Sequence, residues 1–403
     1  MIEVAVLGYG VVGSGTVEVL DKNSDRIARG AGQEIRVKRI LDVRDFPGSP
    51  YESLFVKDFE LIENDPDIAV VVEVIGGVDV ALEFTKRSMM AGKSVVTSNK
   101  ELVAAHGYEL LKLAGERGVN YLFEASVGGG IPIIRPVAQC ISANIINEIY
   151  GILNGTTNYI LTDMAKNGAE FEASLADAQK KGYAEADPSS DVGGHDACRK
   201  ICILSSLAFG KHIYQQYVPT EGIESVTMRD MRCASSMGYK IKLLGRARMM
   251  GEKVAVYVAP HLISKDNLLA DVDGVMNGIV VRGNAVGDLM FYGAGAGKMP
   301  TASAVAADVI DAVKHLNLRK LLNWGEGGPD VVTDPEQIES AWYIRTDAGR
   351  EKVGREFGSV VFADAGNGED TAFRTAVMNG KKVREILGRG ITALSLFRVL
   401  GDY

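Results

Sequence analysis

The chain has 403 residues, of which 46% are hydrophobic and 24% charged, and its formal net charge is −8. This length exceeds one ordinary core, so two or three domains are expected, with the composition of a soluble globular protein. The acidic balance argues against nucleic-acid binding, and no run of eighteen apolar residues could span a membrane. The N-terminus opens on a strand pattern rather than a signal peptide, so we expect a cytoplasmic protein.

The first 130 residues alternate between strand-like and helical patterns. The apolar strand patterns cover 2–7, 37–43, 68–75, 94–97 and 119–125, and helical patterns lie between them, notably at 79–91 and 100–117. This alternation is typical of a parallel sheet covered on both faces. The sequence therefore predicts an α/β fold that begins with a Rossmann-type, doubly wound dinucleotide-binding domain over 1–130.

The character of the sequence changes after residue 130. Helical patterns at 156–167, 171–181 and 196–208 precede strand patterns at 240–249, 253–262 and 278–293. Helices followed by grouped strands predict an α+β second domain over 131–297, for catalysis and dimerisation. Its apolar strands suggest an open face, and hence a homodimer or a larger assembly. The helical pattern at 301–316 should return to the first domain, which would then include about 298–320.

The tail reads as a small third unit over 338–403, with strand, helix and strand patterns. A cluster of glycine, proline and acidic residues at 325–337 predicts the linker before it.

Gly8, Gly10 and Gly13 form a G-x-G-x-x-G pattern directly after the first strand and directly before a helix. The first glycine allows a tight turn, the second a close approach of a pyrophosphate, and the third close helix–strand packing. The helix N-terminus then offers N–H groups to the phosphates. The alternative is a glycine-rich turn that only packs, but its place in a β/α pattern favours a dinucleotide site.

The end of the second strand offers two residues that could read the adenosine ribose. Asp42 would accept a hydrogen bond from a 2′-hydroxyl and favour NAD, whereas Arg44 would pair with a 2′-phosphate and favour NADP. The sequence does not decide between them. Lys57 is a further possible phosphate ligand, although a surface lysine is the simpler interpretation.

A third candidate lies after the fourth strand, in VVTSNKELV. Ser98 and Glu101 have the spacing of a capping box, which predicts a helix start and places Lys100 in the first turn. A cation is unfavourable there, and the carboxyl end of a parallel strand is where such sheets bind ligands. A solvated surface lysine is the competing interpretation.

The most charged stretch is DPSSDVGGHDACRK at 187–200, before an apolar helical run. Asp196 and Lys200 share a helical face, and Asp191 and Glu185 precede the helix. An ordinary ion pair would explain this spacing. A nicotinamide enzyme that reduces an aldehyde would also need such groups, because the carbonyl oxygen must receive a proton and a carboxylate can keep the donor placed and charged.

His195, Cys198 and Cys202 also share one helical face, which raises the question of a metal site. A tetrahedral site needs a fourth ligand, and none is evident. We therefore interpret these cysteines as small packed side chains.

The run from Ala178 to Lys200 closely resembles the signature of homoserine dehydrogenases. Further matching segments are GYGVVG (8–13), TSNK (97–100), EASVGGGIP (124–132), NGTTNYIL (154–161) and GAGAGKMPTASAV (293–305). The resemblance covers about residues 1–320 in the right order. It implies NAD(P)-dependent interconversion of L-homoserine and L-aspartate 4-semialdehyde, whose reductive direction feeds threonine and methionine synthesis.

The resemblance also implies roles for individual residues. Lys200 would be the proton donor, and Lys100 a second lysine at the substrate and the nicotinamide. Glu185 would bind the substrate ammonium, with Asp191 and Asp196 completing the polar pocket. The remaining implied contacts are Gly182 and Thr156 with the substrate, Asn154 and Gly155 beside the nicotinamide, and Val11, Val12, Gly76, Ser98 and Gly295 with the cofactor.

Two further features follow from the resemblance. The family holds a sodium ion with Glu124 and main-chain oxygens of Val127, Gly129 and Ile131, and a glycine loop rich in carbonyls suits such a hard cation. Many relatives also end in an ACT domain, a βαββαβ module that binds an amino-acid effector. Here Thr346-Asp347-Ala348-Gly349 replaces the Asp-x-Pro-Gly turn after the first strand, so we expect a degenerate unit.

Two alternatives to this function stay open at this point. One is a dehydrogenase of the same fold that acts on another small amino acid or aldehyde. The other is a nucleotide sensor that has lost the chemistry, but a sensor would not need to retain Lys100, Lys200 and the central carboxylates.

Overall fold

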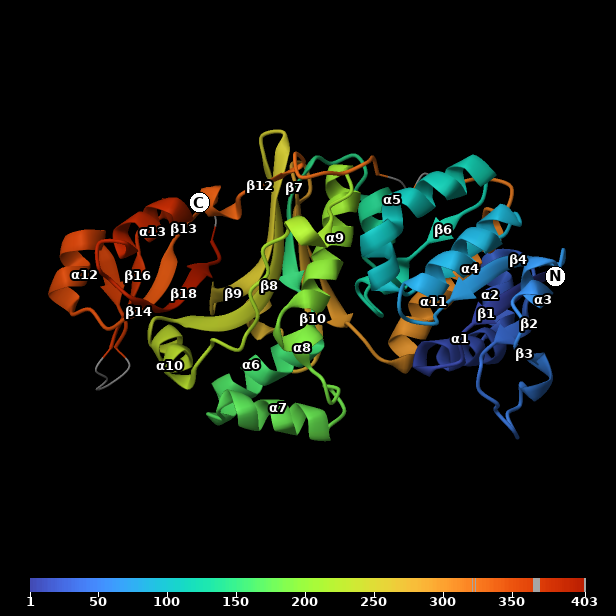
Figure 1. Ribbon diagram of the computed structural model, residues 1–403, viewed down its shortest axis with the longest axis horizontal. Coiled ribbons are helices and arrows are strands. Elements are labelled where there is room, and N and C mark those ends of the chain that lie inside the picture. Colours follow the sequence, from blue (N-terminus) through green and yellow to red (C-terminus); the bar gives the residue numbers. More distant parts are fainter. Residues whose placement is uncertain (321, 323, 365–369, 402–403) are drawn as a thin grey trace. The chain divides into compact units, whose positions relative to one another are not determined.

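The computed structural model divides the chain into two compact units, each built from several segments (Figure 1). The first unit contains 1–145, 202–215 and 293–328, and the second contains 146–201, 216–292 and 329–403. The structure describes residues 1–320, 322, 324–364 and 370–401. Residues 365–369 and 402–403 of the predicted C-terminal unit thus lie outside the described residues, whereas the predicted linker at 325–337 is described in full. The predicted domain boundaries stay a prediction.

The first unit is built on a six-stranded sheet in the order β3-β2-β1-β4-β5-β6. Every neighbouring pair of strands is parallel. The strands are β1 (Ile2–Leu7), β2 (Ile35–Leu41), β3 (Phe55–Val56), β4 (Ile68–Glu73), β5 (Ser94–Thr97) and β6 (Tyr121–Leu122). The order runs outward from β1 and β4 in both directions, which is the doubly wound arrangement predicted from the sequence.

Helices cover both faces of this sheet, because right-handed crossovers that run outward in opposite directions place their helices on opposite faces. One group, α1, α2 and α11, packs together, and α4 packs against α5. The bounds are α1 (Val11–Lys22), α2 (Ser24–Ala31), α3 (Glu60–Glu63), α4 (Asp79–Met90), α5 (Lys100–Arg117) and α11 (Lys298–Lys314). The late helix α11 contacts β4 and β5, as its apolar pattern predicted.

The central strands of this sheet are continuously apolar because both of their faces are covered. Residues Val4–Leu7 of β1 and Val70–Val72 of β4 have no exposed surface. The polar residues of the unit therefore collect where the strands end.

The second unit contains a mixed sheet in the order β11-β10-β7-β8-β9-β18-β14-β16-β15, with β12 beside β9. Its strands are β7 (Ile146–Ile152), β8 (Tyr239–Met250), β9 (Lys253–Ser264), β10 (Met276–Gly283), β11 (Gly287–Ala294), β12 (Val332–Thr333), β14 (Trp342–Thr346), β15 (Val360–Phe362), β16 (Thr371–Thr375) and β18 (Ala393–Val399), and a separate pair is formed by β13 (Glu339–Ser340) and β17 (Met378–Asn379).

The apolar run at 278–293 is not one strand but the two strands β10 and β11. A turn at 284–286 separates them, and Gly287 closes it with a φ of 73°. A residue with a side chain is strained at that φ, so the glycine permits the chain reversal. The pair Gly283-Asn284 is typical of a turn, so the sequence did carry a local signal for this chain reversal.

Helices of the second unit pack on the same sheet. The helix α6 contacts α7, α10, β8 and β10. The bounds are α6 (Gly155–Asn167), α7 (Phe171–Lys180), α8 (Ser189–Val192), α9 (His195–Phe209), α10 (Met228–Ser236), α12 (Arg350–Phe357) and α13 (Gly380–Leu387). Of α9, only the part up to residue 201 belongs to this unit. The long strands β8 and β9 are buried along most of their length, so they do not supply the open apolar face from which we inferred an oligomer.

Apart from the short strand β17 of the separate pair, which precedes α13, the C-terminal segment has the element order β14-α12-β15-β16-α13-β18. Its strands lie in the large sheet in the order β18-β14-β16-β15. This is the βαββαβ arrangement of a split βαβ module. Its last strand, β18, also pairs in parallel with β9 through Arg398 and Val399. The segment is therefore part of the large sheet, and its relation to an effector-binding ACT domain stays a prediction.

No helix among the described residues combines the length and apolarity needed to cross a membrane.

Candidate functional site

The glycine turn after β1 has the backbone geometry that its sequence predicted. Gly8 has a φ of 95°, and a Cβ on Gly13 would lie 1.9 Å from the Gly8 carbonyl oxygen. A Cβ on Gly10, by contrast, would meet no atom within 4 Å, which leaves its outer side open. The turn leads directly into α1, which begins at Val11 without an acidic residue in its first turn. The helix N-terminus can therefore accept an anion.

Asp42 and Arg44 are bonded to each other rather than offered separately. The Asp42 carboxylate accepts from the backbone N–H of Tyr9 (2.7 Å), from the backbone N–H of Arg44 (3.0 Å), and from Nε and Nη2 of the guanidinium (3.0 and 2.9 Å). The hydrogen bond from the Arg44 side chain lowers the pKa of Asp42 to about 2. Asp42 is buried, whereas 59% of the Arg44 side chain is exposed.

Lys100 is the first residue of α5, as predicted, but the capping residue is different. The N-cap is Asn99, whose side chain accepts from the backbone N–H of Leu102 (3.1 Å), and not Ser98. The reason is tertiary: Asn99 also donates to the Gly77 carbonyl (2.6 Å), which fixes it against the turn after β4. In that turn Gly76 and Gly77 have φ values of 90° and 72°.

In the second unit, Asn154 brings two of the predicted carboxylates together. It directly follows Leu153 and is the N-cap of α6, where its side-chain oxygen accepts from the Thr157 N–H (2.8 Å). Its amide nitrogen donates to Asp191 (2.7 Å) and to Asp196 (2.9 Å). Burial raises the pKa of the Asp191 carboxyl, and the hydrogen bond from Asn154 opposes that rise.

Lys200 lies one turn after Asp196 on α9 and completes this cluster. Its ammonium donates to the Leu153 carbonyl (2.8 Å) and pairs with Asp196 (2.9 Å). Lys200 is 7% exposed and Asp196 5%, so this is a buried pair rather than the surface pair that the spacing alone would suggest. An ammonium has three N–H groups, and these contacts use two of them.

A glycine in β8 lets the cluster lie close to the sheet. A Cβ on Gly245 would lie 2.8 Å from a methyl of Leu153 and 3.1 Å from the Cβ of Ile201. Protein interiors are too densely packed to absorb such contacts without movement. The absence of a side chain at Gly245 therefore allows Leu153 and the first turns of α9 to pack closely against β8.

The loop that follows α7 carries Glu185, which is exposed. Its position is fixed through the backbone: Gln179 donates to the Glu185 carbonyl (3.1 Å), and Thr156 donates to the Tyr183 carbonyl (2.6 Å). Gly182, with a φ of 74°, allows the turn. The structure thus ties this loop to the start of α6, two residues from Asn154, and leaves the Glu185 carboxylate at the surface.

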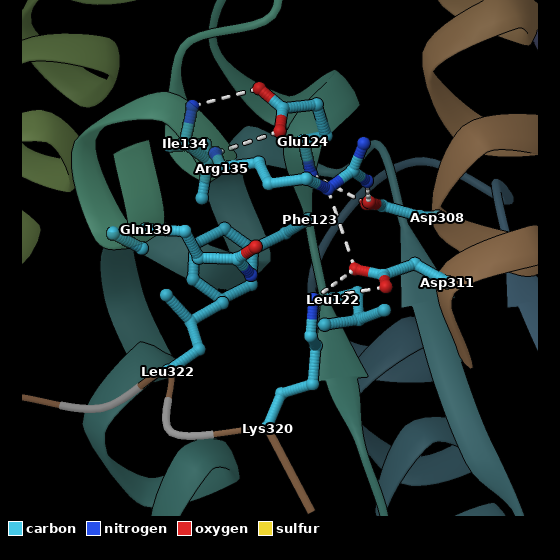
Figure 2. A pocket seen from close by; sticks show the side chains of 11 residues that line it. Leu122, Phe123, Glu124, Ile134, Arg135, Gln139, Asp308, Asp311, Lys320 and Leu322 are labelled. Carbon is cyan, nitrogen blue, oxygen red and sulfur yellow. Dashed lines mark hydrogen bonds and ion pairs between the residues drawn. The ribbon is translucent and has the colours of Figure 1, made fainter. Parts of the chain in front are cut away.

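Glu124 of the first unit is buried and bound by backbone donors. Its carboxylate accepts from the N–H groups of Ile133 (2.6 Å), Ile134 (2.7 Å) and Arg135 (2.8 Å), and Arg135 also pairs with Asp308 (2.5 Å). Figure 2 shows Glu124, Ile134, Arg135 and Asp308 among the side chains that line a cavity. The volume of this cavity is about 260 Å³. Glu124 therefore anchors the segment after the glycine loop.

The glycine loop itself, residues 127–131, packs against Gly295. Gly129 has a φ of 56°, and a Cβ on it would lie 2.4 Å from the Gly295 carbonyl oxygen. The structure thus places Gly295 beside this loop within the first unit.

No group of three or more histidine, cysteine or acidic residues that could hold a metal occurs within the described part of the chain. Cys198 and Cys202 are buried without a disulfide, in keeping with a packing role.

Each unit thus contributes one kind of chemistry. The first offers a turn for a dinucleotide pyrophosphate, a guanidinium beside it and a lysine at the carboxyl end of a parallel strand. The second offers a buried ammonium held in a fixed position by a carboxylate and a carbonyl, and such a group can act as a proton donor. Sequence reasoning missed the bridging role of Asn154, although a polar N-cap before Gly-Thr-Thr was a visible signal.

Comparison with known proteins agrees with this arrangement. Residues 8–124 match the family model described as homoserine dehydrogenase, NAD binding domain, and residues 132–310 match the model described as homoserine dehydrogenase. A homoserine dehydrogenase from Pseudomonas aeruginosa is 43% identical over 355 residues, which cover 86% of this chain and 82% of that protein.

Solved structures give the same result. A homoserine dehydrogenase from Thiobacillus denitrificans has a TM-score of 0.89 and 37% identity, over 99% of this chain and 98% of that one. A hyperthermophilic archaeal homoserine dehydrogenase in complex with NADPH has a TM-score of 0.65 and 28% identity, over 77% of this chain and 97% of that one. The chain therefore belongs to the homoserine dehydrogenase family of NAD(P)-dependent oxidoreductases.

Proposed function

We propose that this chain interconverts L-homoserine and L-aspartate 4-semialdehyde, with Lys200 as the group that gives the proton to, or takes it from, the substrate oxygen. The observation that carries the proposal is the buried Lys200 ammonium, held by Asp196 and the Leu153 carbonyl. The test is reduction of NAD(P) that depends on added homoserine. Absence of that activity in folded protein would contradict the proposal.

A nicotinamide cofactor, with its pyrophosphate held at the turn of Gly8, Gly10 and Gly13, would supply the hydride chemistry at the substrate carbon. Lys200 gives a proton to the developing alkoxide in the reductive direction and stabilises its charge before the transfer. Asp196 pairs with the ammonium and orients it, while Asn154 holds Asp196 and Asp191 together. Asp191 and the exposed Glu185 supply negative charge for the substrate ammonium, and Lys100 is the second lysine at the reacting groups.

The geometry of Asp42 and Arg44 favours NADP. A carboxylate has about four acceptor positions, and four donors already occupy that of Asp42. A ribose 2′-hydroxyl would have to displace Arg44 in order to bind Asp42. The exposed Arg44 guanidinium, in contrast, is held at this position and can pair with a 2′-phosphate.

Arg44→Ala should therefore lower kcat/KM for NADP by ~10-fold or more, because charged hydrogen bonds to a phosphate are lost. The value for NAD should hold or rise, since the Asp42 carboxylate becomes free for the ribose. Steady-state kinetics with both cofactors measures this ratio. Lys57→Ala is the matched control: Lys57 pairs with Asp45 on the surface, so the ratio should stay within ~3-fold. An unchanged ratio in Arg44→Ala would remove Arg44 as the discriminating residue.

We also propose that the glycine loop at 127–131 holds a sodium ion, with Glu124 beside it. Among the hydrogen bonds of the described residues, none is accepted by the carbonyls of Val127, Gly129 or Ile131. The Glu124 Oε2 atom accepts a single backbone N–H, so an acceptor position remains on it. Four oxygen ligands of this kind suit a hard cation.

Sodium chloride should then raise the melting temperature above the value in choline chloride of equal ionic strength, because a bound ion stabilises only the folded state. Glu124→Gln should reduce that difference as well as the stability itself. Thermal unfolding in the two salts provides the measurement, and identical melting temperatures in both would exclude the ion.

The broader setting rests on the same family assignment. We propose that the reductive direction serves threonine and methionine synthesis in the cytoplasm, and that the chain acts as a homodimer or homotetramer. Light scattering on the purified protein would give the oligomeric state.

A further inference from the structure

A buried carboxylate lies at the carboxyl end of the first unit's sheet and has no part in the function described above. Glu73 is the last residue of β4 and has no exposed surface. It accepts hydrogen bonds from the backbone N–H of Ile75 (2.8 Å) and from the Thr97 hydroxyl (2.6 Å). Burial raises the pKa of its carboxyl. The three residues that precede Glu73 in β4, Val70–Val72, are apolar, so Glu73 is the polar residue at this end of the strand.

The hydrogen bonds continue from Thr97 to the start of α5. The Thr97 hydroxyl oxygen accepts from the Asn99 backbone N–H (2.9 Å), and Asn99 is the N-cap that precedes Lys100. The Asn99 side chain then donates to the Gly77 carbonyl (2.6 Å). Glu73, Thr97 and Asn99 thus close a ring of hydrogen bonds between the turn after β4 and the turn after β5.

The turn after β4 is also in contact with the glycine turn. A Cβ on Gly8 would lie 2.8 Å from the Val74 carbonyl oxygen, and the Val74 N–H donates to Leu7 (3.0 Å). The Glu73 carboxylate therefore joins the turn after β4 to the turn after β5, and the turn after β4 in turn contacts the glycine turn, at the edge where such sheets bind their ligands.

Fold stability alone is a poor explanation for this arrangement. Burying a carboxylate is unfavourable, and an apolar residue of similar volume often stabilises a core equally well or better. A fully hydrogen-bonded polar network does, however, hold its members in one geometry. The feature that this network holds is the first residue of α5, Lys100.

We propose that Glu73 and Thr97 are positioning residues, which fix the start of α5 and so place Lys100 for the reaction. They do not touch the substrate; they act through Asn99 and Lys100. The inference rests on the role of Lys100 in the proposed function.

The test is a double-mutant cycle with Thr97→Val and Lys100→Ala. Valine keeps the shape of threonine but removes the hydroxyl that joins Glu73 to Asn99. Thr97→Val should lower kcat by ~10-fold, since small displacements of a catalytic group are costly, while KM for homoserine and cofactor stays within ~3-fold. In the Lys100→Ala background the same substitution should change kcat by less than ~2-fold, because residues that act through each other are not additive.

Two further variants separate positioning from general damage. Thr97→Ser keeps the hydroxyl and should restore kcat to within ~2-fold of the wild type, since the same hydrogen bonds can form. Thr85→Val is the matched control: Thr85 is equally buried in the same unit, and its hydroxyl has no hydrogen-bond partner among the described residues. It should leave kcat unchanged.

Two results would overturn the inference, and they are distinguishable. If Thr97→Val lowers kcat equally with and without Lys100, the effect does not pass through Lys100, and only the positioning role fails. If Lys100→Ala itself has a near-normal kcat, the proposed function of Lys100 fails and the inference falls with it. Glu73→Gln can replace Thr97→Val in the same double-mutant cycle with Lys100→Ala. The effect of Glu73→Gln on kcat should not add to that of Thr97→Val.

Discussion

Lys200→Ala should lower kcat by about 10²-fold or more, which is the usual scale for loss of a general acid. The affinity for the cofactor should stay near that of the wild type, because the predicted cofactor contacts are the glycine turn and the residues after the strands of the first sheet. Steady-state kinetics measures kcat, and fluorescence titration of the reduced cofactor measures its dissociation constant.

Lys200→Ala should also lower the free energy of unfolding. In an exposed pair, loss of the lysine would cost less than ~1 kcal/mol, but this pair is buried. Removing Lys200 breaks its ion pair with the buried Asp196, and Asn154 holds a second carboxylate, Asp191, beside Asp196. The expected loss is therefore ~3 kcal/mol of unfolding free energy, whether or not Lys200 is catalytic. Stability alone does not distinguish the two interpretations.

Two further variants of the cluster avoid this difficulty. Lys200→Arg keeps the positive charge, yet a guanidinium does not release a proton at neutral pH, so kcat should fall while stability is largely kept. Lys200→Met combined with Asp196→Asn removes both charges together and should fold better than Lys200→Ala. If either variant is folded by circular dichroism and retains kcat within a few-fold of the wild type, Lys200 is not the proton donor.

Deletion of residues 338–403 should destabilise the whole second unit rather than remove an independent module. The segment supplies β18, which lies between β9 and β14 in the sheet. Ile338 also covers Ala255, Tyr257 and Ala259 of β9. Exposure of these buried side chains corresponds to ~5 kcal/mol, which would lower the melting temperature by about 10 °C or more in a unit of this size.

Thermal unfolding of the truncated and full-length chains provides the measurement. A truncated chain that melted at the wild-type temperature would show that the segment is dispensable. Because truncation should damage the sheet, it cannot by itself reveal effector binding. Titration of the intact chain is the cleaner experiment: we expect L-threonine to change neither activity nor melting temperature, since the turn at 346–349 lacks the Pro-Gly pair of the effector-binding relatives.

Local patterns predicted those parts of the fold that local physics determines. The glycine turn and the alternation in the first 130 residues were predicted because a positive φ and a buried parallel strand each have a strong compositional signal. The start of α5 was predicted to within one residue. The predicted N-cap residue, Ser98, was wrong. Asn99 takes that position because its side chain also donates a hydrogen bond to the carbonyl of Gly77, 22 residues earlier.

The remaining features depend on contacts between distant parts of the sequence. Asn154 meets Asp191 and Asp196 across 37 and 42 residues, and no spacing rule connects them. The depth of burial of Lys200 depends on Gly245 in β8, which the sequence did not single out. The hairpin of β10 and β11 was missed although Gly283-Asn284 marks its turn, because residues 278–293 were interpreted as one strand-like run.

The pairing of β18 with β9 has a consequence for how the chain is made. A ribosome releases β9, at 253–264, long before β18, at 393–399. Folding of the first unit is also delayed, because its helix α11 begins only at residue 298 and is therefore synthesised late. During synthesis β9 therefore presents an unpaired edge, which is the kind of surface that recruits strands from other chains. We therefore expect chains whose synthesis stalls before residue 393 to depend strongly on chaperones. A reporter tag fused after β18 should give a signal only from chains in which β18 has been made and can pair with β9.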